Sequence, residues 1–161
     1  MKLREIKLMS QNHFIGMEYY YLILNRTFLI IKTHGYLIGI QGNGLISAEV
    51  SVNPITEYIN STLTIKEDLS DPYSYIKNSY IKKIKELDLL DGSHLKINKH
   101  NFLISTLDIK SAIYNPSKKF GMGNYPHDGR VIIETSKNVK REFIILGDQS
   151  GYDISKFILA S

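Results

Sequence analysis

The chain of 161 residues contains no cysteine, only three alanines and no long uninterrupted apolar run. The absence of cysteine excludes disulfides and thiolate metal sites. Arg26 and Lys32 interrupt the most apolar segment, so no run reaches the roughly 18 apolar residues of a membrane-spanning helix. Residues 1–7 lack the apolar core of a secretory signal peptide, and we therefore expect a cytoplasmic protein.

The composition favours strands over helices. Isoleucine occurs 24 times and tyrosine 11 times. β-Branched and aromatic side chains fit the pleated surface of a sheet. We expect residues 1–161 to form a single domain, because this length is sufficient to bury a hydrophobic core.

Positive charge is concentrated in the second half of the chain. Residues 1–80 contain seven Lys or Arg and seven Asp or Glu, whereas residues 81–161 contain 13 and nine, which accounts for the net charge of +4. An excess this small is typical of a solvated surface, and it leaves an anionic partner as the alternative.

The C-terminal segment has the clearest pattern. Residues 130–135 and 139–146 alternate on either side of three polar residues, which predicts a β-hairpin. Ser150 then begins a capping sequence that is followed by apolar residues at helical spacing. We predict a short helix that covers the open end of a curved sheet and buries Phe157 together with Phe143.

Five further strands are predicted, at residues 2–9, 19–24, 27–32, 101–105 and 108–114. Asn25 and Arg26 are predicted to form the two-residue turn of a hairpin, because asparagine tolerates the left-handed backbone of a tight turn. Residues 36–40 could extend the sheet. Whether residues 36–52 form an additional strand is left open by the pattern.

Two helices are predicted between residues 53 and 92. Asn53-Pro54 and Asp71-Pro72 each place a capping residue before a proline at the first helical position. After Asp71-Pro72, apolar residues recur at spacings of three and four at Tyr73, Ile76, Tyr80, Ile84 and Leu87. Gly92 is predicted to end this helix, and Lys82 and Lys85 lie off its apolar stripe.

Two segments carry a resemblance to a known family. Residues 19–30 read YYYLILNRTFLI and residues 99–111 read KHNFLISTLDIKS. They resemble the segments yyLiLTdkRLif and kknFsIpysdIkkv of uncharacterised bacterial pleckstrin-homology-like (PH-like) domain proteins. The resemblance implies an α+β, mainly β fold, namely a seven-stranded PH-like split barrel with a C-terminal capping helix. It also implies a helical insert, at about residues 53–92, between the third and fourth strands.

The segment from Lys118 to Arg130 is the strongest candidate for a ligand site. Gly121 and Gly123 would let backbone N–H groups form an anion-binding nest. Lys118, Lys119 and Arg130 could then pair with phosphate oxygens. The G-x-G pattern does not lead from a strand into a helix and is therefore not a nucleotide-binding fingerprint. The alternative is a solvated connection between strands.

Metal binding and catalysis have little support in the sequence. His94 and His100 could approach His127 and Asp128, but their spacing is not that of a recognised ligand set, and we expect no metal or cofactor. No nucleophile motif occurs, so no catalytic residue is assigned, and a small hydrolase using His94, His100 or His127 ranks last. The tyrosine clusters lack interleaved basic residues, so no nucleic-acid partner is expected.

These patterns lead to a hypothesis of a non-catalytic protein-interaction module with an unidentified protein partner. The partner would bind at an exposed strand edge, or at the helical insert through Lys82 and Lys85. The alternative is binding of an anionic membrane surface or phosphate headgroup through Lys118, Lys119 and Arg130.

Overall fold

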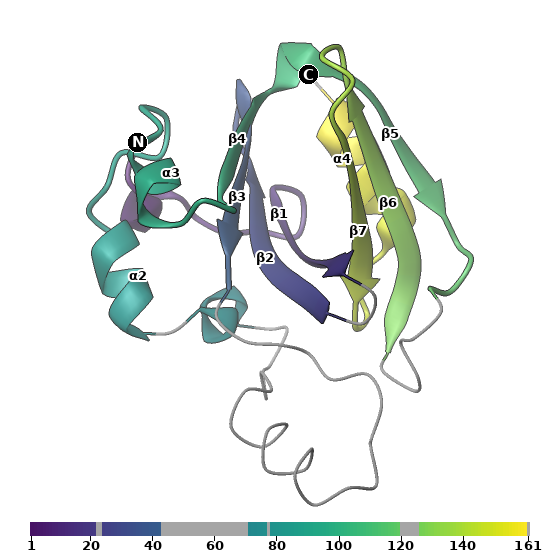
Figure 1. Cartoon of the computed structure of the whole chain (residues 1–161), viewed down its shortest axis with the longest axis horizontal. Coiled ribbons are helices and arrows are strands. Elements are labelled where there is room, and N and C mark those ends of the chain that lie inside the picture. Colours follow the sequence, from purple (N-terminus) through teal and green to yellow (C-terminus); the bar gives the residue numbers. More distant parts are fainter. Residues whose placement is uncertain (22–23, 43–70, 77, 120–125, 161) are drawn as a thin grey trace, which may run out of the picture.

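In the computed structural model, seven antiparallel strands form one sheet in the order β4-β3-β2-β1-β7-β6-β5 (Figure 1). The structure describes residues 1–21, 24–42, 71–76, 78–119 and 126–160. The strands are β1 His13–Tyr21, β2 Leu24–Lys32, β3 Tyr36–Gln41, β4 Phe102–Ser105, β5 Ile109–Asn115, β6 His127–Thr135 and β7 Lys140–Leu146. The helices are η1 Leu3–Glu5, η2 Pro72–Tyr75, α2 Asn78–Ile84, α3 Ser93–Ile97, η3 Thr106–Asp108 and α4 Gly151–Leu159. The predicted mainly β fold with seven strands is confirmed.

The sheet curls because its two edge strands are consecutive in the chain. Only η3, with three residues, connects β4 to β5. In a flat sheet these edges would be six strand spacings, roughly 29 Å, apart, whereas three residues span only about 10 Å. The Thr106 N–H donates to the Gly35 carbonyl and the Ser136 N–H donates to the Asp108 carbonyl, so η3 is bonded to both halves of the sheet.

Aromatic rings mark the concave face of the sheet. Phe143 of β7 lies 6.0 Å from Phe28 of β2 and 6.0 Å from Phe102 of β4, measured between ring centroids. These strands are not neighbours of β7, so the rings meet across a concave surface. Ile154 and Ile158 of α4 join the same buried cluster. The predicted closing helix therefore lies against the concave face, as Figure 1 shows.

The convex face of the sheet is also covered. Its buried cluster combines alternate side chains of the strands with Leu3 from the N-terminal segment and with Ile76, Ile84 and Leu89. Residues 27–31 of β2 are consequently 0% exposed at five consecutive positions. Burial on both faces explains why the apolar runs of this chain lack a strict alternation.

The predicted hairpin and closing helix are confirmed. β6 and β7 pair across a turn in which Asn138 has a positive φ of 58°. The Ser150 Oγ accepts a hydrogen bond from the Asp153 N–H at 3.1 Å and caps α4. Phe143 is fully buried, whereas Phe157 is partly buried, and Phe14 contacts both of these rings.

The predicted strand at residues 2–9 is wrong. Leu3–Glu5 form η1, and the Lys2 N–H donates to the Glu5 carboxylate. Farther along, the Asn12 side chain accepts from the Met9 N–H and donates to the Lys7 carbonyl. These local hydrogen bonds satisfy backbone groups that, in a strand, would have to bond to a neighbouring strand.

The predicted turn at Asn25 and Arg26 is also wrong. Both residues belong to β2, where they lie opposite Tyr19 and Glu18 of β1. Asn25 is buried, which is a poor position for the tip of a hairpin. β1 also begins at His13, six residues before its predicted start.

Tyr36–Gln41 form β3, which answers part of the open question about residues 36–52. It is β3 that replaces the wrongly predicted first strand in the count of seven. Residues 45–52 and the predicted helix after Asn53 lie outside the described residues.

The helix predicted from Asp71 to Gly92 is broken. Asp71 caps η2 as predicted, because its carboxylate accepts from the Tyr73 N–H at 3.0 Å. Ile76 is extended and buried in the convex cluster, and Gly92, with φ 78°, precedes α3. Of the predicted apolar stripe, Ile76 and Ile84 are buried, and Tyr73 and Tyr80 pack partly buried against the same cluster, but the stripe does not lie on one continuous helix.

Candidate functional site

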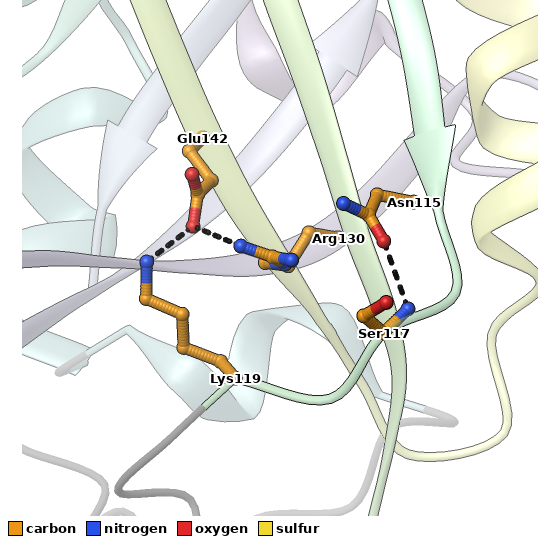
Figure 2. A network of polar contacts seen from close by, with 5 residues as sticks. All are labelled: Asn115, Ser117, Lys119, Arg130 and Glu142. Atoms are coloured by element: carbon orange, nitrogen blue, oxygen red, sulfur yellow. Dashed lines mark hydrogen bonds and ion pairs between the residues drawn. The ribbon is translucent and has the colours of Figure 1, made fainter.

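The structure brings together two of the cations in the predicted anion site. Lys119 follows β5, Arg130 lies in β6, and both approach the carboxylate of Glu142 in β7 (Figure 2). The distances are 2.6 Å from the Lys119 Nζ and 3.4 Å from an Arg130 nitrogen to the same oxygen. Lys118 is exposed. Gly121 and Gly123 lie outside the described residues.

Glu142 offsets part of the positive charge at this site. Burial raises the pKa of Glu142, but Lys119 and Arg130 together lower it by more than burial raises it. The net shift is downward, and the carboxylate is ionised at neutral pH. An anionic ligand would have to compete with this carboxylate for both cations. Binding of a phosphate at this site stays a prediction, and the Glu142 carboxylate already occupies the position next to Lys119 and Arg130 that the phosphate would need.

The histidines named in the sequence analysis do not form a metal centre with one another. The described residues contain no group of three or more His, Cys, Asp or Glu side chains that could hold a metal ion. His94 is fully buried, and its Nε2 lies 3.3 Å from the carbonyl oxygen of Phe102 in β4. The Asn101 side chain donates to the His94 carbonyl, which fixes α3 beside β4. His94 thus has a clear packing role.

Burial lowers the pKa of His94 below its usual 6.5, an effect opposed by the Phe102 carbonyl and by Asp91. The unfolded chain therefore binds the proton more readily, and the free energy of unfolding should fall as the pH drops below about 6.5. His94→Gln is expected to lose less stability than the wild type between about pH 7 and pH 5. Burial also lowers the pKa of His13 and His100, so part of the slope should persist. Chemical denaturation at each pH measures the free energy of unfolding of both proteins. If the values for the wild type and His94→Gln fell in parallel as the pH drops, the prediction would be contradicted.

The two edge strands of the sheet, β4 and β5, each pair with a single neighbouring strand. At β4, His94 of α3 contacts a backbone carbonyl, as described above. Among the described strands, β5 pairs with β6 alone, and no backbone hydrogen bond links it to another strand. An unpaired edge strand offers a row of N–H and C=O groups to another chain.

The helix α4 borders β5 and turns one partly apolar flank toward it. Gly151 lies so close to the Tyr114 ring of β5 that an added Cβ would be 2.6 Å from it. Tyr152 and Leu159, 56% and 49% exposed, lie on the flank next to buried Ser155, because an α-helix repeats every 3.6 residues. We call the edge of β5 together with this flank of α4 the β5–α4 groove.

A small cavity lies at one end of the β5–α4 groove. It measures about 230 Å³ and is lined mainly by apolar side chains, from Leu107, Ile109, Ile158, Leu159, His34, Thr106 and Ala160. Leu107 in η3 is 94% exposed. This cavity could accept one apolar side chain of a bound segment.

Basic residues flank the β5–α4 groove. Lys110 and Lys118 are exposed on and after β5, and Lys156 of α4 has its Nζ 5.2 Å from the Tyr152 ring centroid. The exposed lysines outnumber the carboxylates next to them, Asp108 and Asp128. Asp128 accepts from the Tyr114 hydroxyl and the Gly151 N–H, both at 2.7 Å, and Asp108 pairs with Lys137. The groove therefore favours a partner with negative charge.

The groove was missed by reasoning from the sequence, although a signal was present. Tyr152 and Leu159 lie off the apolar stripe of α4, and Leu107 is an isolated apolar residue between polar neighbours. Lys82 and Lys85, predicted as partner-binding residues, are both exposed, on α2 and just after it.

The chain matches no family model, and comparisons with curated proteins and with solved structures gave no significant match. None of the helices in the described part of the chain is long and apolar enough to span a membrane.

Proposed function

We propose that this chain is a PH-like domain that acts as a non-catalytic protein-interaction module. The strand number, the curled sheet and the C-terminal helix support the PH-like assignment. The segment between β3 and β4 contains η2, α2 and α3, which fits the proposed helical insert. The function is carried by one observation, the unpaired edge of β5 beside the exposed flank of α4.

A partner would bind by adding an extended segment to β5. Main-chain hydrogen bonds to the free edge would supply affinity, and side-chain contacts would supply specificity. Apolar contacts are offered by Tyr152 and Leu159 and by the cavity beside Leu107. The exposed Lys110 and Lys156 favour acidic residues in the segment and should raise its association rate.

The double variant Lys110→Glu/Lys156→Glu is expected to lower partner recovery by roughly tenfold, because it reverses the charge along the groove. Quantitative mass spectrometry of proteins that co-purify with each variant measures this recovery. Both lysines are exposed, so the fold should tolerate the change.

Lys82→Glu/Lys85→Glu is a matched control with the same change in charge on the α2 side. Loss of partners with this pair alone would move the interaction to the insert and overturn the assignment to β5. Retention of the same partners by both double variants would contradict the proposed function altogether.

A further inference from the structure

A second and larger cleft lies on the other side of α4, away from β5. One wall is the N-terminal segment from Ile6 to His13, and another is formed by Asp71, Pro72 and Tyr73. The turn after β7 and the first turns of α4 close the cleft. Its volume of about 900 Å³ falls within the range of small-molecule sites, roughly 300–1,000 Å³.

The wall of this cleft formed by α4 and the turn before it is fixed by the fold. The Gln149 side chain accepts from the Ile15 N–H at 2.8 Å and donates to the carbonyls of Ile15 and Leu146 at 2.9 and 2.7 Å. It therefore anchors the turn before α4 to β1. The Phe157 ring packs edge-on against Phe14, with 6.0 Å between centroids. This wall needs no rearrangement to receive a ligand.

The interior of the cleft is mainly apolar, with side chains from Ile6, Leu8, Tyr73, Ile154 and Phe157. Tyr73 and Phe157 add aromatic surface, which attracts cations as well as apolar groups. Burial of apolar ligand surface here would provide the non-directional part of the binding energy.

The charge of the cleft is opposite to that of the whole chain. Asp71, Asp148 and Asp153 line it, and no Lys or Arg is among its described lining residues. The Nδ1 of His13 lies 2.6 Å from the Met9 carbonyl, and burial lowers the pKa of His13. His13 is therefore neutral at pH 7 and does not offset the three carboxylates.

The N-terminus of α4 does not provide an anion site within this cleft. The Gly151 N–H donates to Asp128, and the Asp153 N–H donates to the Ser150 Oγ. These are two of the N–H groups that a bound anion would need at a helix N-terminus. The adjacent carboxylates would repel an anion as well.

We infer that this cleft binds an organic cation that carries an apolar group. The apolar group would lie between Phe157, Tyr73 and Leu8, and the ammonium would lie at the rim beside Asp71 and Asp148. This site is independent of the β5–α4 groove, because it uses the opposite flank of α4 and the opposite charge.

Titration with dansylcadaverine, an apolar fluorophore on an alkylammonium chain, tests the inference. Its fluorescence should rise with saturation below about 1 mM and weaken as salt is added. An analogue that ends in a carboxylate, dansyl-aminohexanoate, should bind at least about tenfold more weakly. Asp71→Asn/Asp148→Asn should lower the affinity for dansylcadaverine by roughly three- to tenfold, and not by more, because exposed charge pairs are individually weak.

Asp91→Asn/Glu134→Gln is the matched control, since it removes two carboxylates elsewhere. Asp91 also resembles Asp71 in its local role, because each carboxylate accepts from the N–H two residues ahead. The control should bind the cation as the wild type does. Equal affinity for the two dansyl probes, equal affinity of the two double variants, or absence of saturation would each overturn the inference.

Discussion

Replacement of Phe143 by alanine is expected to lower the free energy of unfolding by about 3–5 kcal/mol. Phe143 is fully buried, and its ring centroid lies 5.8–6.0 Å from those of Phe14, Phe28 and Phe102. These rings belong to three other strands, so one side chain joins both halves of the curled sheet. Alanine would leave a cavity where these rings meet on the concave face. Chemical denaturation measures the change.

Ile113→Ala is the matched control for Phe143→Ala. Ile113 lies in β5 and is 55% exposed, so its truncation should change the free energy of unfolding by less than about 1 kcal/mol. A loss at Phe143 as small as that at Ile113 would contradict the packing described for the concave face.

The elements that were predicted correctly depend on local chemistry. The β6–β7 hairpin follows from alternation and from a turn at Asn138, and α4 follows from the Ser150 cap. Each signal involves residues within a few positions of one another. At these positions the local signals agree with the fold of the whole chain.

The errors arise where distant contacts decide the structure. In β2 both faces are buried, so the apolar run does not show where the strand begins, and the sequence wrongly predicts a turn at Asn25. Ile76 interrupts the predicted helix because it packs against the convex cluster. Neither burial on two faces nor a cluster formed by several segments is visible in local periodicity.

The candidate sites show the same limit. Lys119 and Arg130 were expected to meet a phosphate, but Glu142, from another strand, lies between them. The β5–α4 groove depends on β5 being an edge strand, which is a consequence of strand order. Residue types indicate what chemistry a site could perform, whereas topology decides which residues share it.

Glu18 and Arg141 form a second contact that only the tertiary structure shows. They are 123 residues apart, and two hydrogen bonds join them, from the Arg141 Nε at 2.9 Å and from a terminal nitrogen at 2.7 Å. Both side chains are less than one-fifth exposed. The guanidinium also lies 3.8 Å from the Phe102 ring centroid and 5.4 Å from that of Phe143. The ion pair therefore completes one end of the aromatic core.

Glu18→Gln is expected to lower the free energy of unfolding by about 3 kcal/mol, because Arg141 would keep its charge in a largely buried position without a carboxylate. Glu18→Leu/Arg141→Met should recover most of this loss, since a buried ion pair can be replaced by apolar residues at little cost. Denaturation of the wild type and both variants measures the difference. If the double variant were less stable than Glu18→Gln, the Glu18–Arg141 ion pair would itself stabilise the fold. The loss in Glu18→Gln could then not be explained by the unpaired charge of Arg141 alone. That result would also mean that Arg141, stacked on Phe102, stabilises the core more than the apolar packing of a methionine at the same position.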